Sequence, residues 1–372
     1  MKKFIAISVV LALVVTGAFA ETRVSGSVEV RWNILEIDEN KDGTGGPIAR
    51  TGTNTSAAGG VMHAGVVQLS HADPDEGIRG VLKLQWEGYN AFSFDSAWIE
   101  WKPIDQVAFF LGRDGDGKFQ NSNLTRWAFH RMPRGISVEG WDGHGYIIGA
   151  WDGAGAALTV NPIDMINVNL VLNLADRDAL EEAPSRLRRW EDVWQDSFLA
   201  TVNFNLDFGR INLTYSNISY GWPWGPSFKD IIGVSFHSNR LIDGIELEVG
   251  GHYRPEDDAN PIRLGLGVFW NGGDFGVKFR SLARIPGSAD DRLYIASDIM
   301  PWYMTDFAEI RLSVRLIVDQ TGSADPTIGW HVNPYIVKGL GPVQFRAGIM
   351  LEDDNGDGTL GFKLPISFIL GF

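Results

Sequence analysis

The sequence predicts an all-β protein, a transmembrane antiparallel up-and-down β-barrel with about 18 strands. Apolar and polar residues alternate with a period of two along many segments, as they do in half-buried strands. Glycine and tryptophan are abundant, at 44 and 14 residues, which suits tight turns and aromatic belts better than helices. After the first twenty residues, no apolar stretch approaches the ~20 residues of a membrane helix.

The first twenty residues have the form of a secretory signal peptide. Lys2 and Lys3 precede an apolar run at 4–15, and Ala18-Phe19-Ala20 has the small-x-small form of a cleavage site. We therefore expect a signal peptide at 1–20, cleavage near Ala20, export, and a barrel formed by 21–372. A retained membrane anchor is the alternative, which the short apolar run disfavours. Loss of the two lysines would change the formal charge from -14 to -16.

Alternation begins directly after the predicted cleavage position. In segment 23–34, Val24, Val28 and Trp32 share one face while Arg23 and Arg31 lie on the other. Such a strand is long enough to cross a membrane. The same alternation recurs at 82–86, 211–215, 264–270, 310–316 and 343–349. A soluble β-sandwich would also alternate, so the connections between strands carry further weight.

The connections are of two kinds. Segments 102–106 (KPIDQ) and 161–165 (NPIDM) resemble one turn used twice, and 206–210 and 270–274 are equally tight. Longer polar segments lie at 36–60, 114–144 and 176–196. Short periplasmic turns opposite longer extracellular loops are typical of outer-membrane barrels, which have an even number of strands. The region 135–160 reads as one strand or several, so 16 strands are the alternative.

The last strand carries the most specific signal. In segment 360–372, LGFKLPISFILGF, apolar residues occupy alternate positions back from the terminal Phe372, and Pro365 is the main departure. Together with the signal peptide, the absence of cysteine and the repeated alternation, this strand resembles those of the outer-membrane porins of diderm (Gram-negative-type) bacteria.

This resemblance implies a passive diffusion channel for small hydrophilic solutes and ions in the bacterial outer membrane. Its partners would be outer-membrane lipid, the barrel-assembly machinery and two further copies of the chain in a homotrimer, with no nucleic acid. The assembly signal would consist of Phe368, Leu370 and Phe372.

The polar faces of the predicted strands are rich in basic residues, although the whole chain is acidic. The predicted basic lumen wall consists of Arg31, Lys83, Arg210, Arg263, Lys278, Arg280, Arg311, Arg315, Arg346 and Lys363. The acids that oppose it are fewer, namely Glu29, Glu87, Glu100, Glu246 and Glu248. Basic groups in a narrow pore lower the barrier for anions, so we expect a weak anion preference. A wide channel without selectivity is the alternative.

By the same resemblance, the segment 114–144 is the candidate constriction loop that folds into the barrel. Its charged residues are Asp114, Asp116, Lys118, Arg126, Arg131 and Arg134. Charges of both signs at a constriction create a transverse field. An ordinary extracellular loop is one alternative, and closure of the pore by the basic and aromatic segment 186–194 is another.

Two loops share the pattern D-x-N-x-D-G-T, at 38–44 and 353–359. An EF-hand requires an acid at position 12, where these loops have Ala49 and Leu364, so that site is excluded. Plain acidic turns are the simpler interpretation. Barrel closure would nevertheless bring the two loops together, which predicts one weak calcium site. Its ligands would be Asp38, Asn40, Asp42, Asp353, Asn355 and Asp357.

The remaining motifs do not indicate an enzyme. The seven histidines lack zinc-ligand spacing, and neither a nucleophile elbow nor a phosphate-binding loop occurs. We therefore expect no required cofactor. Aromatic clusters at 222–226 and 300–304 are interpreted as interfacial girdle residues. With Trp98 on the lumen face, they also leave open a carbohydrate-specific channel. A non-conducting adhesin or receptor that displays loops on its barrel is the other alternative.

Overall fold

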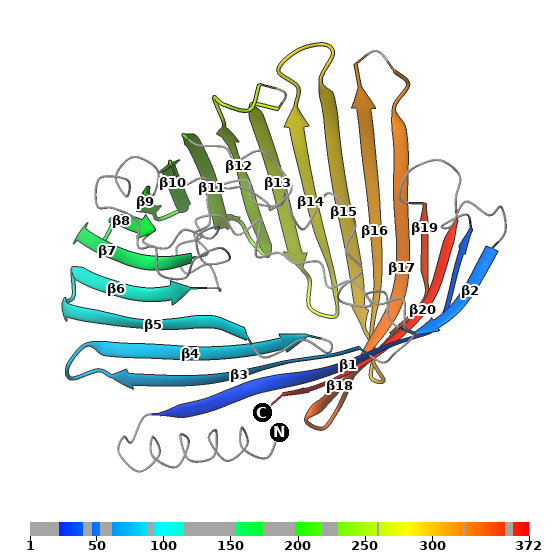
Figure 1. Ribbon diagram of the computed structural model, residues 1–372, viewed down its shortest axis with the longest axis horizontal. Coiled ribbons are helices and arrows are strands. Elements are labelled where there is room, and N and C mark those ends of the chain that lie inside the picture. Colours follow the sequence, from blue (N-terminus) through cyan, green and yellow to red (C-terminus); the bar gives the residue numbers. More distant parts are fainter. Residues whose placement is uncertain are drawn as a thin grey trace, which may run out of the picture.

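The computed structural model describes residues 22–39, 47–52, 62–87, 93–114, 153–173, 198–217, 230–258, 260–322, 324–353 and 360–371. These residues form one antiparallel sheet that curves round to meet itself (Figure 1). Its strands are β1 (Arg23–Glu39), β2 (Pro47–Gly52), β3 (Met62–Asp73), β4 (Ile78–Glu87), β5 (Ser93–Ile104), β6 (Val107–Asp114), β7 (Gly153–Ile163), β8 (Ile166–Asn173), β9 (Phe198–Leu206), β10 (Gly209–Ser216), β11 (Ile231–Ile242), β12 (Ile245–Tyr253), β13 (Ile262–Asn271), β14 (Phe275–Ile285), β15 (Arg292–Met304), β16 (Glu309–Thr321), β17 (Thr327–Leu340), β18 (Val343–Gly348), β19 (Met350–Asp353) and β20 (Gly361–Gly371).

The barrel closes between β1 and β20. Their register runs from Ser27 opposite Gly371 to Asp38 opposite Gly361. On its other edge β1 pairs with β3 and then with β2, so these two strands share one position in the wall. β18 and β19 share another position between β17 and β20. The wall therefore has eighteen positions, which confirms the predicted number and rules out sixteen.

The predicted long loop at 36–60 is wrong in part. β1 continues to Glu39, and β2 occupies 47–52 within the same segment. The two strands pair from Asn33–Gly52 to Glu39–Pro47, with an irregularity between Asn33 and Glu36. Continued pairing satisfies backbone groups that a long loop would have to leave to water. Alternation alone does not show where such pairing stops.

The short turns gather at one end of the barrel. Ile104 faces Val107 across the first KPIDQ-type turn, and Ile163 faces Ile166 in the same way across the second. The two similar sequences therefore form similar turns, as predicted. The end of β20 lies at this end too, because the Gly371 amide donates to the Pro342 carbonyl over 3.4 Å.

Along the described strands, most outward side chains are apolar and most inward ones are polar. In β13, Ile262, Leu264 and Leu266 are exposed on the outer face, whereas Arg263 between them is buried on the inner face. Two serines on the outer face are hydrogen-bonded to each other, since the Ser281 and Ser297 hydroxyls lie 2.9 Å apart on neighbouring strands. This pairing suits a surface where lipid provides no hydrogen-bond partner. Among the described residues, no helix is both long and apolar enough to cross a membrane.

One glycine in the wall is required by its backbone. Gly112 in β6 has a φ of 137°, and a Cβ there would lie 2.2 Å from the Ala97 carbonyl oxygen. It lies opposite Trp98 in the β5–β6 register. The missing side chain lets β6 approach β5 closely beside the large indole ring.

We expect Gly112→Ala to destabilise the barrel by on the order of 1–3 kcal/mol, because the added methyl group collides with backbone in a strained conformation. The midpoint of urea unfolding, followed by tryptophan fluorescence in lipid vesicles, measures the change. Gly339→Ala in β17 is the matched control, since a Cβ there meets nothing within 4 Å. An equal effect of both substitutions would contradict this explanation.

Candidate functional site: the inner wall of the barrel

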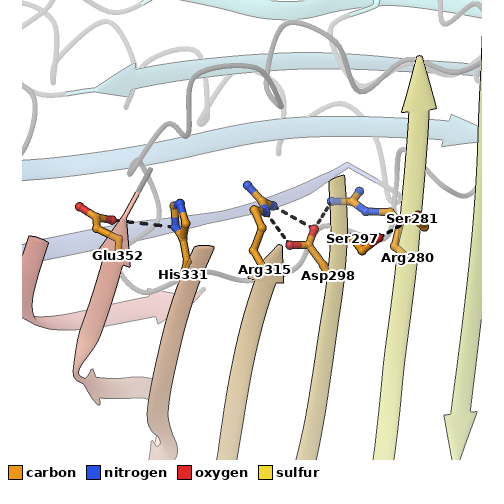
Figure 2. Close-up of polar contacts among 7 residues, drawn as sticks. All are labelled: Arg280, Ser281, Ser297, Asp298, Arg315, His331 and Glu352. Atoms are coloured by element: carbon orange, nitrogen blue, oxygen red, sulfur yellow. Dashed lines mark hydrogen bonds and ion pairs between the residues drawn. The ribbon is translucent and has the colours of Figure 1, made fainter. Parts of the chain in front are cut away.

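The inner wall carries a charged centre on β14, β15 and β16. Asp298 accepts two hydrogen bonds from Arg315, at 2.5 Å and 2.9 Å, and one from Arg280 at 3.2 Å (Figure 2). The Asp298 side chain is only 1% exposed and that of Arg315 only 3% exposed. One carboxylate thus compensates two guanidinium groups where water is largely excluded.

The same row continues on the following strands. The register places Arg280, Asp298, Arg315, His331 and Glu352 directly opposite one another in turn. His331 Nδ1 lies 3.9 Å from Glu352 Oε2, and the Lys363 ammonium group contacts Glu352 Oε1. We call the five opposed residues, Arg280, Asp298, Arg315, His331 and Glu352, the central charged row. Figure 2 shows their side chains on one side of the wall, spread across the strands.

A different sector of the wall is polar without charge. On β7 to β10, Asn169 donates to Thr201 over 3.0 Å, and Asn212 donates to Asn203 over 2.9 Å. The residues of this amide network are Thr159, Asn161, Asn167, Asn169, Thr201, Asn203, Asn212 and Thr214. The amides of Asn167, Asn169, Asn203 and Asn212 both donate and accept, and that of Asn161 accepts, so the sector forms a continuous chain of hydrogen bonds.

An apolar patch lies on the inner face beside the amide network. Phe110, Ala157, Val171 and Leu199 are buried together, and Trp98 packs against them. The Trp98 and Phe110 ring centroids lie 5.5 Å apart. The patch interrupts the polar inner face along the neighbouring strands β5 to β9.

Nine predicted basic residues of the lumen wall have described side chains, and the register places all nine on the inner face. At least five of them have an acidic partner, which the sequence prediction did not foresee. These pairs are Arg263–Asp257, Arg280–Asp298, Arg311–Glu309, Arg315–Asp298 and Lys363–Glu352. The positive charge available to a solute is therefore smaller than the count of basic residues indicates. A role of these residues in selectivity stays a prediction.

The acids Asp298, Glu309 and Glu352 were missed as wall residues, and the pairing of the loop residue Asp257 with Arg263 was not expected. Asp298 follows the same alternation as its neighbours, with Ile295 and Ile299 on the opposite face. The alternation around Asp298 is therefore a sequence signal for its inward position. The pairing itself was not accessible, because partners such as Asp298 and Arg315 are set by register.

Other predicted site residues lie outside the described residues. For the candidate constriction loop, this holds for Asp116, Lys118, Arg126, Arg131 and Arg134, while Asp114 ends β6 with its side chain outside the described part. The Arg31 side chain, residue Phe372 and the predicted signal peptide are likewise not described. Phe368 and Leu370 project from the outer face of β20, at 42% and 41% exposed.

The two acidic loops leave the wall close to each other. Asp38 lies opposite Gly361, and Gly361 lies opposite Glu352, so the ends of β1 and β19 flank the start of β20. Asn40, Asp42, Asn355 and Asp357 lie outside the described residues, as does the Asp38 side chain. Within the described residues, no three histidine, aspartate or glutamate side chains gather closely enough for a metal ion. The calcium site stays a prediction.

Comparison with known proteins identifies the fold. A BenF-like porin from Pseudomonas fluorescens Pf-5 aligns with a TM-score of 0.53 at 8% identity, covering 95% of this chain and 100% of that chain. A triple mutant of the Rhodopseudomonas blastica porin aligns with a TM-score of 0.50 at 11% identity, covering 94% and 100%. No family model and no curated protein matches the sequence. The predicted porin-type barrel is thereby confirmed as a fold.

Removal of the charge at Asp298 should destabilise the barrel strongly. We expect Asp298→Asn to cost about 3 kcal/mol, because two buried guanidinium groups lose their shared counter-charge. Urea unfolding in lipid vesicles measures the loss. The control is Asp105→Asn in the Lys102–Asp105 pair, whose aspartate side chain is 94% exposed, and we expect no measurable change there. Equal effects at both positions would show that burial of the pair does not matter.

The predicted calcium site can be tested through stability. We expect millimolar Ca²⁺ to raise the thermal unfolding temperature of the protein by a few degrees, because a ligand bound only to the folded state stabilises it. Asp42→Asn combined with Asp357→Asn should abolish the shift. A barrel whose unfolding temperature is the same with Ca²⁺ and with EDTA would refute the site.

Proposed function

We propose that this chain is an outer-membrane porin, a passive diffusion channel for small hydrophilic solutes and ions with a weak anion preference. The observation that carries the proposal is the closed barrel of eighteen strand positions, with an apolar outer face and a polar, charged inner face. Side chains fill the interior of an eight-stranded barrel, whereas barrels of 16 to 18 strands leave an aqueous channel. The two porins of similar fold support the same interpretation.

The anion preference rests on the balance of charge along the wall. Acidic partners offset the charge of Arg263, Arg280, Arg311, Arg315 and Lys363, whereas Arg210 and Lys278 form no ion pair within the described residues. Lys278 instead lies 5.1 Å from the centre of the Phe269 ring, and Arg346 donates to Gln344 over 2.8 Å. A small surplus of positive charge in a low-dielectric pore favours anions without excluding cations.

The likeness to porins extends the proposal to assembly. We infer export with cleavage near Ala20, insertion by the barrel-assembly machinery through the terminal strand, and a homotrimer in the outer membrane. The exposed Phe368 and Leu370 on β20 support the insertion signal, because they continue the outward apolar pattern to the end of the described chain.

A carbohydrate-specific channel is the second candidate, and one arrangement favours it. Trp98 on β5 presents an aromatic ring on the inner face, and the amide network follows on β7 to β10. Stacking on a ring combined with amide hydrogen bonds is chemistry that suits sugars. Saturable block of the ion current by maltose, lost in Trp98→Ala, would favour this candidate over a general channel.

Ion conduction in planar bilayers tests the main proposal. In a KCl gradient, we expect the purified protein to conduct with a reversal potential that shows a modest preference for chloride. Lys278→Gln and Arg210→Gln should each reduce this preference, because each removes one positive charge from the wall. Lys338→Gln is the matched control. Lys338 follows the inward Val337 in β17, so it lies on the outer face, where it contacts the Phe307 ring.

Two results would decide against the proposal. A barrel that is folded but does not conduct would favour the adhesin or receptor alternative. Cation preference would leave the channel in place and refute the selectivity.

A further inference from the structure

The aromatic segment 300–304 (MPWYM) is divided between the two faces of β15. Tyr303 projects from the outer face and is 52% exposed, as a girdle residue would be. Trp302 takes the inner face, because it lies opposite Gly276 on β14 and opposite the inward Arg311 on β16. The girdle interpretation is therefore wrong for Trp302, whose ring belongs to the interior of the barrel.

Gly276 provides the space for the Trp302 ring. A Cβ at position 276 would collide with the six-membered ring of the indole, so a larger residue there would displace it. The indole stacks with Phe269 of β13, with 5.5 Å between the ring centroids and 18° between the planes. Phe269 lies on the inner face too, because it is directly opposite the inward Lys278. We call Trp302 and Phe269 the ring platform.

The ring platform lies on the short-turn side of the central charged row. Along β15, Trp302 is two inward positions beyond Asp298, toward the turn at 305–308, and the buried Met300 occupies the position between them. Both rings of the platform are half-buried, so each keeps part of its surface open to the interior. Aromatic surface that remains in contact with water gains free energy when a solute covers it.

The charges around the platform balance. Glu246 and Lys278 flank it on β12 and β14, and Glu309 and Arg311 flank it on β16. Arg311 donates from Nε and Nη2 to the two oxygens of Glu309, over 2.7 Å and 2.8 Å. Glu246 Oε1 lies 2.7 Å from His237 Nε2. Two basic and two acidic groups leave no net charge, so the platform does not select a solute by the sign of its charge.

Lys278 is the donor that a solute on the platform can use. Its ammonium nitrogen lies 5.1 Å from the centre of the Phe269 ring. Within the described residues it forms no ion pair, since the neighbouring acids Glu246 and Glu309 bond to His237 and Arg311. An ammonium group carries three donors, so an acceptor at the edge of the platform would be bound there.

We propose that the ring platform binds planar heteroaromatic solutes with a hydrogen-bond acceptor at the ring edge. The flat face stacks on the exposed aromatic surface, as any π-system can, and the edge acceptor receives a hydrogen bond from Lys278. A sugar fits less well, because its several hydroxyls need partners while Arg311 and Glu309 are bonded to each other. Selection of such solutes during transport rests on the proposed function, whereas binding itself does not.

Nicotinamide, a neutral pyridine ring with one carboxamide, is the probe that tests the platform. Saturation-transfer NMR of the folded protein in detergent, titrated with nicotinamide, measures binding without requiring conduction. We expect saturable binding that is weakened about tenfold in Trp302→Leu, because leucine still covers Gly276 but offers no flat face for stacking. Heat-modifiable migration on gels checks the folding of each variant.

Tyr303→Leu is the matched control, since it removes the adjacent aromatic ring from the outer face of the same strand. Unchanged nicotinamide binding in this control, with weaker binding in Trp302→Leu, supports the platform. Absence of saturable binding in the original protein, or equal weakening in the two variants, overturns it.

Two further ligands test the class of solute. Cyclohexanecarboxamide carries the same amide on a saturated ring, and we expect it to bind much more weakly than nicotinamide. Equal binding of the two amides, or displacement of nicotinamide by glucose, overturns the assignment to planar heteroaromatic solutes. Nicotinamide binding by a protein that does not conduct would refute the channel and leave the platform standing, whereas conduction without nicotinamide binding would refute the platform alone.

Discussion

Closure of the sheet between β1 and β20 is the constraint on which the rest of the molecule depends. In hydrocarbon an unpaired strand edge leaves amide and carbonyl groups without partners, at several kcal/mol for each group. The long β1–β20 register removes that edge, even though Pro365 in β20 lacks a donor opposite Asn33. Once the wall is closed, alternate residues must face either the membrane or the interior, and every side chain is assigned to one of two environments.

The inner environment explains why charge is arranged in rows. Directly opposed residues on adjacent strands lie about 5 Å apart, so an acid on one strand reaches basic groups on both neighbours. Asp298 uses this geometry with Arg280 and Arg315. Glu352 lies directly opposite His331 and reaches Lys363 diagonally on β20. Rows that carry compensating acids stabilise the wall.

Most of the fold was predictable from the residues. The alternation in 264–270 and 310–316, the repeated KPIDQ and NPIDM turns and the apolar terminal strand all express physical needs local to one strand or turn. The site was predictable only in part. Alternation placed Arg280 and Arg315 on the inner face, yet their neutralisation by Asp298 depends on which residues oppose one another, and a shift of one residue would reverse the faces.

The sequence by itself determined the class of structure, the orientation of each strand's two faces and the basic character of the inner wall. These follow from side-chain polarity along single strands, where lipid and water impose opposite demands on neighbouring residues. Only the tertiary structure decided that β2 and β3 share one wall position and that five basic residues are neutralised. Such relations join residues far apart in the chain, and they exist only after strand pairing has set the register.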